Sequence, residues 1–171
     1  MNLPDGWLSP VEIQELQRLA TGKTVLELGA WKGRSTVVLS QVATYVVSVD
    51  RHQGLDVPAD HPQSGSDSLP DYLDAVRELE NVAIVVADFR SFLPHLSVAF
   101  DLAFVDGNHD ADSVERDAFL ACQHTYFSTG IVVFHDYDME SVREGVKRVF
   151  GRQFGRQPDS LAGSLAAFTV Q

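Results

Sequence analysis

Short apolar runs alternate along the chain with longer segments in which apolar residues recur at helical spacing. The runs predict five strands, at residues 24–28, 45–49, 82–87, 101–106 and 131–134. The segments between them predict four helices, at residues 33–43, 69–80, 90–96 and 112–127. Further helices are predicted at 8–20 and 140–150, and closing strands at 152–157 and 164–170. This alternation is typical of a Rossmann-like, doubly wound sheet of seven mostly parallel strands, with helices on both faces in a three-layer α/β sandwich.

Local signals predict the ends and the faces of several elements. Ser9 and Glu12 form a capping-box pattern at the start of the first helix. The apolar face of that helix is assigned to Val11, Ile13, Leu16, Leu19 and Ala20. Asp112 is predicted to cap the helix at 112–127. The run at 82–87 is almost wholly apolar, which is typical of a central parallel strand.

Composition limits the class of protein. The chain has 171 residues, an apolar fraction of 44% and a net charge of −11, which favours one globular domain over residues 1–171. The acidic balance argues against a nucleic-acid partner, because such interfaces need a basic face. The single cysteine, Cys122, excludes an internal disulfide and is expected to lie in the core. We find neither a long apolar run nor a signal-peptide pattern, so we expect a cytoplasmic protein with no membrane partner.

The segment at 24–36 carries the strongest signal for a ligand site. A buried strand leads into Gly29, and a helix begins near Gly33. A glycine turn of this kind presents backbone N–H groups and the positive end of the helix dipole to a ligand. Asp50, at the end of the next apolar run, is suited to accept hydrogen bonds from both hydroxyls of a ribose. The two features together predict a nucleoside cofactor, whereas the turn alone is also compatible with a connection that binds nothing.

The spacing of the glycines discriminates between nucleoside cofactors. Dinucleotide-binding turns carry a second glycine two residues after the first, which lets a pyrophosphate approach the backbone. Trp31 occupies that position here and would block the approach. An NAD-dependent oxidoreductase is therefore the weaker alternative.

Polar side chains end each of the five predicted parallel strands. They are Glu27, Asp50, Asp88, Asp106 and the pair His135-Asp136. Ligands of doubly wound sheets bind outside the carboxyl ends of the strands. These side chains therefore predict a functional site at that edge of the sheet.

Several of these residues carry a resemblance to a known family. The pattern Glu27-x-Gly29-x-x-x-Gly33 resembles motif I of the class I S-adenosylmethionine (SAM) dependent methyltransferases. The segments 106–117 and 130–137 resemble methyltransferase domain family 24, and the similarity runs from about residue 22 to the C-terminal strand. The resemblance implies a SAM-dependent methyltransferase that acts on a small-molecule acceptor, with oxygen as the expected atom. A non-catalytic SAM- or nucleoside-binding domain is the alternative.

The resemblance also implies which residues bind the cofactor. They are Glu27, Gly29, Ala30, Trp31, Gly33, Ser35, Asp50, Arg51, Asp88, Phe89 and Asp106. Within this set, Asp88 is expected to bind the adenine amino group and Phe89 to cover the ring. A helix cap is the alternative role of Asp88.

Methyl transfer to a hydroxyl needs a group that removes its proton, either a base or a metal ion that lowers its pKa. Asp106, His109 and His135 are the candidate catalytic residues. Asp106 and Asp136 are candidate ligands for Mg²⁺ or another divalent cation. Related metal-dependent enzymes carry Asp-Asn where this chain has Asp136-Tyr137, so His109 acting as a base without metal is the alternative. His135 has the alternative role of a histidine fixed by hydrogen bonds within the edge.

Residues 51–67 are polar and rich in Gly, Pro, Ser and Asp, which predicts a long loop. His52 and His61 lie in it, and we expect them either to touch the substrate or to be solvated surface residues. Substrate cover is expected from the helix at 8–20, from this loop or from a neighbouring subunit. A homo-oligomer is therefore left open.

Overall fold

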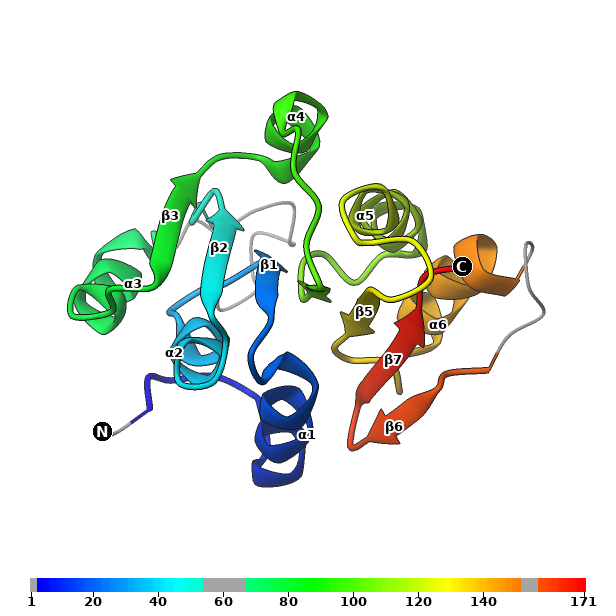
Figure 1. Cartoon of the computed structure of the whole chain (residues 1–171), viewed down its shortest axis with the longest axis horizontal. Helices are drawn as coiled ribbons and strands as arrows, with labels where there is room; N and C mark the ends of the chain where they lie inside the picture. Colours follow the sequence, from blue (N-terminus) through cyan, green and yellow to red (C-terminus); the bar gives the residue numbers. More distant parts are fainter. Residues whose placement is uncertain (1–2, 54–66, 152–156) are drawn as a thin grey trace.

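The computed structural model describes residues 3–53, 67–151 and 157–171. Within these residues a seven-stranded sheet has the order β3-β2-β1-β4-β5-β7-β6 (Figure 1). The strands are β1 Thr24–Leu28, β2 Tyr45–Asp50, β3 Val82–Val86, β4 Leu102–Val105, β5 Ile131–Phe134, β6 Ser160–Ala162 and β7 Leu165–Thr169. Strands β1 to β5 pair in parallel, whereas β7 is antiparallel to both β5 and β6. The predicted doubly wound, mostly parallel sheet is confirmed.

Helices cover both faces of the sheet (Figure 1). One face carries α1 Pro10–Ala20, α2 Arg34–Ser40 and α3 Leu69–Val76. The other carries α4 Phe89–Phe92, α5 Ala111–Gln123 and α6 Glu140–Val146. A 3₁₀ turn (η1, Leu93–His95) extends α4, and a π-helical segment (η2, Lys147–Gly151) extends α6. None of the helices in the described part of the chain is long and apolar enough to cross a membrane.

Among the described residues, two large apolar cores and a smaller cluster around Ala30, Tyr72 and Val76 hold the layers together. On the α5 and α6 side, the rings of Phe134, Phe150 and Phe168 pack with centroids 4.6–6.0 Å apart. On the α1 and α2 side, Leu16 and Leu39 pack with the inner side chains of the sheet. These cores fix the carboxyl ends of the parallel strands, where polar side chains emerge.

Strand β3 differs from its prediction as a central strand, because it lies at the edge of the sheet. Ile84 and Val86 are accordingly 41% and 52% exposed. The most central strand is β4, between β1 and β5. An apolar run therefore shows neither that both faces of a strand are covered nor how many strands flank it.

Several element ends also differ. Helix α5 is capped by Asp110, whose side chain accepts a hydrogen bond from the Ser113 N–H at 2.9 Å, rather than by Asp112. Helix α3 ends at Val76, four residues before its predicted end. Val11, assigned to the apolar face of α1, is 52% exposed. The strand predicted at 152–157 lies almost wholly outside the described residues, and the strand that precedes β7 and pairs with its outer edge is Ser160–Ala162.

Candidate active site

A cleft of about 230 Å³ opens at the carboxyl ends of the parallel strands. Most of the predicted site residues line it, namely Gly29, Ala30, Trp31, Ser35, Asp50, Arg51, Asp88, Phe89, Asp106, His109 and Asp136. The strand ends of β1, β2, β4 and β5 thus contribute to one site, together with the residues that follow β3. The N-terminal residues Gly6, Trp7 and Leu8 also line the cleft. Leu8 begins the segment 8–20 that was expected to cover the substrate, whereas no sequence pattern indicated Gly6 and Trp7.

Gly29 joins the ends of two neighbouring strands. Its φ is +93°, and a Cβ there would lie only 2.1 Å from the Asp106 carbonyl oxygen. Its N–H donates to the Val49 carbonyl at 3.0 Å. Only glycine accommodates both this backbone conformation and this approach.

Gly29→Ala is expected to lower the free energy of unfolding by at least about 2 kcal/mol, because the strain of a positive φ adds to a clash with backbone. Gly22→Ala is the matched control, since Gly22 has a φ of +70° but nothing within 4 Å of its Cβ position. Chemical denaturation of both variants measures the difference. Equal losses in the two variants would show that the contact with Asp106 contributes nothing.

Asp50 organises the turn above β1. One carboxylate oxygen accepts the N–H groups of Ala30 and Trp31 at 2.7 and 2.8 Å, and the other accepts the N–H of His52 at 2.7 Å. The charge of Asp50 therefore lies at the cleft and fixes the backbone that forms its wall. Trp31, His52 and Asp136 all have positive φ values of 45–56°, so the cleft is built from constrained backbone.

Two residues predicted to bind the cofactor do not line the cleft. Glu27 is completely buried beneath it, where Oε2 accepts hydrogen bonds from Thr36 and Ser48. Gly33 is buried as the N-cap of α2, in the left-handed conformation. Both residues flank the glycine turn and hold it from beneath the cleft. The motif therefore includes residues that stabilise the turn as well as residues that line the cleft. Burial raises the pKa of Glu27 to about 7, against the partial effect of its hydroxyl donors.

Asp88 occupies the position of a helix cap. Its side chain accepts the Arg90 N–H at 2.9 Å and lies 3.7 Å from the Arg51 guanidinium. The alternative role as a cap is thus confirmed. Asp88 and Phe89 also line the cleft, and the expected contacts to adenine stay a prediction.

His52 is 3% exposed, so the solvated-surface interpretation is wrong for it. Its Nδ1 lies 3.1 Å from both the Trp31 carbonyl oxygen and the Ser68 hydroxyl, and its ring packs on Tyr72. These contacts cover the ring, and His52 also lines the cleft, so its contact with the substrate stays a prediction. His61 lies outside the described residues.

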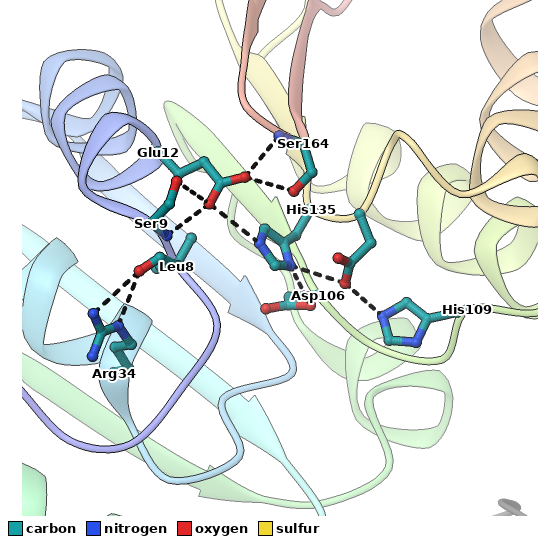
Figure 2. A network of polar contacts seen from close by, with 9 residues as sticks. Leu8, Ser9, Glu12, Arg34, Asp106, His109, His135 and Ser164 are labelled. Atoms are coloured by element: carbon teal, nitrogen blue, oxygen red, sulfur yellow. Dashed lines mark hydrogen bonds and ion pairs between the residues drawn. The ribbon is translucent and has the colours of Figure 1, made fainter.

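Two histidines converge on one carboxylate (Figure 2). His109 Nε2 lies 2.9 Å and His135 Nδ1 3.0 Å from Asp136 Oδ2. His135 Nδ1 is also 3.4 Å from Asp106 Oδ1. Asp106 and Asp136 follow the neighbouring strands β4 and β5, which explains why their side chains meet.

Glu12 lies next to His135, on the side of the ring away from Asp136. The sequence indicated only a capping-box role for Glu12. That box is present, with Glu12 Oε2 accepting from Ser9, but Oε1 also accepts the N–H and hydroxyl of Ser164 at 2.7 and 2.6 Å. Glu12 Oε2 lies 3.9 Å from His135 Nε2 (Figure 2). Glu12 therefore ties α1 to the β6–β7 turn beneath the histidines. A contact between residues so distant along the chain gives no local signal.

The family model for the methyltransferase domain matches residues 26–137, which is more than half of the chain. The chain belongs to the methyltransferase domain family. A search among curated proteins found no match.

Solved structures of methyltransferases share the fold. The O-methyltransferase NovP matches with a TM-score of 0.73 and 15% identity, over 93% of this chain and 79% of NovP. The O-methyltransferase TomG from Streptomyces achromogenes, solved with SAM, matches with a TM-score of 0.65 and 20% identity, over 99% and 84%. A protein from Streptococcus mutans described as SAM-dependent matches with a TM-score of 0.58 and 19% identity, and the chain spans 39% of its length. The predicted family and the class I methyltransferase fold are confirmed.

Charges in this methyltransferase domain are tightly coupled around Asp136. Burial alone would raise the pKa of Asp136, but hydrogen bonds from His109 and His135 outweigh it and hold the pKa well below its usual range. Burial lowers the pKa of His135, yet its contacts with Asp106 and Asp136 raise it to about 10. The hydrogen bond to Asp136 also raises the pKa of His109. His135 is thus a buried cation between two carboxylates, which agrees with its alternative role as a fixed histidine.

Asp106, His109 and Asp136 could also hold a cation, because one ligand atom of each lies within 4.8 Å of the others among the described residues. The set has two carboxylates and one imidazole, which suits a hard or borderline divalent ion. In this arrangement, however, Asp136 Oδ2 already accepts from two imidazoles. Metal binding stays a prediction.

Proposed function

We propose that this methyltransferase domain transfers the methyl group of SAM to an oxygen atom of a small-molecule acceptor. The proposal rests on one observation above all. The His109–Asp136 hydrogen bond lies in the same cleft as the Gly29 turn and Asp50. The residues expected to bind the nucleoside and the candidate base therefore line one cleft.

The cleft residues fit the cofactor. Gly29 packs closely on the Asp106 backbone and Gly107 on the Phe89 ring, and all four residues line the cleft, so the turn that would face the cofactor is held against the end of β4. The carboxylate of Asp50 at the end of β2 suits ribose hydroxyls. When bound, SAM supplies an electrophilic methyl group on a sulfonium.

His109 is assigned the role of general base. Asp136 accepts from Nε2 and orients the ring, which leaves Nδ1 to take the proton of the acceptor hydroxyl. The acceptor oxygen then forms the new bond to the methyl carbon while the carbon–sulfur bond breaks and its electron pair stays on sulfur. His135, held by Asp106 and Asp136, acts as a positioning residue for this pair. No step requires a metal ion.

The first test is calorimetric titration of the whole chain with SAM and with S-adenosylhomocysteine, each with and without Mg²⁺. Micromolar binding supports the proposal, and no binding under any condition overturns it. A stronger affinity in Mg²⁺ would support the predicted metal ligands. Methylation of a hydroxyl acceptor would then exclude a domain that only binds the nucleoside.

Asp50→Asn is expected to weaken binding of S-adenosylhomocysteine about ten-fold or more, because hydrogen bonds to a charged group contribute roughly 1.5–3 kcal/mol. Asp74→Asn is the control, since its side chain is 77% exposed on α3. Calorimetry gives both dissociation constants. Wild-type affinity in a folded Asp50→Asn variant would remove Asp50 from the site.

A further inference from the structure

Both tryptophans of the chain meet at the mouth of the cleft. The rings of Trp7 and Trp31 stack with centroids 4.4 Å apart and planes 26° from parallel. Trp31 belongs to the glycine turn, whereas Trp7 comes from the N-terminal segment ahead of α1. Both line the same cleft as His109.

The segment that carries Trp7 is held in place on both sides of it. The Arg34 guanidinium donates to the Pro4 carbonyl at 3.0 Å and to the Leu8 carbonyl at 3.1 Å (Figure 2 shows the second contact). Leu8 is 4% exposed and packs in the core beside α1. The position of Trp7 is therefore fixed by two anchors and by its partner ring.

Trp7 is nevertheless 66% exposed. An indole that packs one face on Trp31 and leaves much of its surface open offers a flat apolar platform at the cleft. Because the Trp7 ring is already immobilised, stacking of a planar ligand on it costs little further side-chain entropy of the protein.

The proposed function points to the same ligand class. It places the acceptor oxygen in the cleft that both tryptophans line. A hydroxyl carried directly on a planar aromatic ring combines a group that can be methylated with a flat face that can stack on Trp7.

We propose that Trp7 is the stacking platform of the acceptor subsite, and that the acceptor is a planar phenolic compound. The inference rests on the proposed function and names the substrate class of that site. A competing occupant of the platform is the adenine of the cofactor, and the experiment separates the two.

The test measures binding by calorimetry to the full chain saturated with S-adenosylhomocysteine. The probes are 2-naphthol and its saturated counterpart decahydro-2-naphthol, which share a skeleton but differ in planarity. Wild type is expected to bind 2-naphthol roughly two- to ten-fold more tightly, since stacking contributes roughly 0.5–1.5 kcal/mol beyond burial. Trp7→Leu is expected to lose this preference, and Trp7→Phe to keep most of it.

Affinity for S-adenosylhomocysteine is expected to change less than about three-fold in Trp7→Leu. A large loss of that affinity would assign the platform to adenine and overturn the inference. Equal binding of both probes to wild type, binding of neither, or an unchanged preference in Trp7→Leu would also overturn it. Phe127→Leu is the control, because Phe127 is a 74% exposed aromatic residue that does not line the cleft.

The same titrations distinguish failure of the proposed function from failure of the acceptor assignment. If wild type does not bind S-adenosylhomocysteine at all, the methyltransferase proposal is lost. If it binds the cofactor but shows no preference for the planar probe, only the acceptor class is lost. Intrinsic fluorescence gives a second readout, because the emission of Trp7→Phe comes from Trp31 alone.

Discussion

His109→Gln is expected to lower kcat by about 10²–10⁴-fold, with little change in the affinity for S-adenosylhomocysteine. Glutamine keeps a donor near Asp136 but cannot take the acceptor proton. Single-turnover kinetics measures the methyl-transfer step, and calorimetry measures cofactor binding. His95→Gln is the control, since His95 is exposed in η1 and does not line the cleft.

The pH profile tests the same assignment. The base must be neutral, and the hydrogen bond to Asp136 raises the pKa of His109 above its ordinary value of 6.5. The neutral fraction, and with it kcat/KM, therefore increases as pH rises and levels off above that raised pKa. Asp136→Asn weakens the cause of the shift, so the midpoint is expected to move to lower pH. A wild-type rate or an unchanged pH profile in His109→Gln would remove His109 as the base.

Much of this site was predictable because strand ends coincide with local sequence signals. An apolar run that stops at a polar residue marks where a parallel strand leaves the core. Asp50, Asp106 and Asp136 were predicted in this way, and Gly29 from the glycine turn that follows the first strand. Parallel pairing brings these strand ends to one edge of the sheet. The bounds of β1 and β5 also agree with the predicted ranges.

The missed residues owe their roles to contacts that are distant along the chain. Trp7 precedes the first helix and reaches the cleft only because Arg34 holds its segment. The capping-box pattern fully accounts for Glu12 in the local sequence, so no sequence signal indicated its contact with Ser164. The edge position of β3 was missed for the same reason, since strand order depends on crossovers and not on the composition of a run.

Two buried carboxyl groups are expected to make the protein less stable as pH rises from about 5 to 8. Burial raises the pKa of Glu27 from 4.5 to about 7 and that of Asp117 from 3.8 to about 7, although Arg90 partly offsets the second. Asp117 is completely buried on α5, and its nearest cation is the Arg90 Nε at 3.6 Å. Neither of its oxygens has a hydrogen bond among the described residues.

Stability falls with rising pH because the folded chain binds more protons than the unfolded chain in this range. Between the ordinary pKa values and about 7, the unfolded chain has released protons that the folded chain still holds, so raising the pH favours unfolding. At about 1.4 kcal/mol per pH unit, the free energy of unfolding changes by roughly 3–4 kcal/mol for Glu27 and roughly 4–5 kcal/mol for Asp117 over the whole range, and roughly 2–3 kcal/mol of each change falls between pH 5 and pH 8. Above pH 6.5 the elevated pKa of His135 acts in the same direction, because its stabilising charge is lost as pH approaches about 10.

Glu27→Gln and Asp117→Asn should each remove part of this pH dependence, because an amide cannot ionise. Urea denaturation at pH 5 and pH 8 gives the change in unfolding free energy for each variant. The new amide can lower the free energy of unfolding because it lacks a hydrogen-bond partner. That loss is the same at both pH values, so it does not change the difference between them. Glu78→Gln, whose side chain is 80% exposed, should retain the wild-type slope. If both buried variants also retain the wild-type slope, these carboxyl groups are ionised in the folded protein at neutral pH. Contacts other than those to Thr36, Ser48 and Arg90 would then offset the cost of burying their charges.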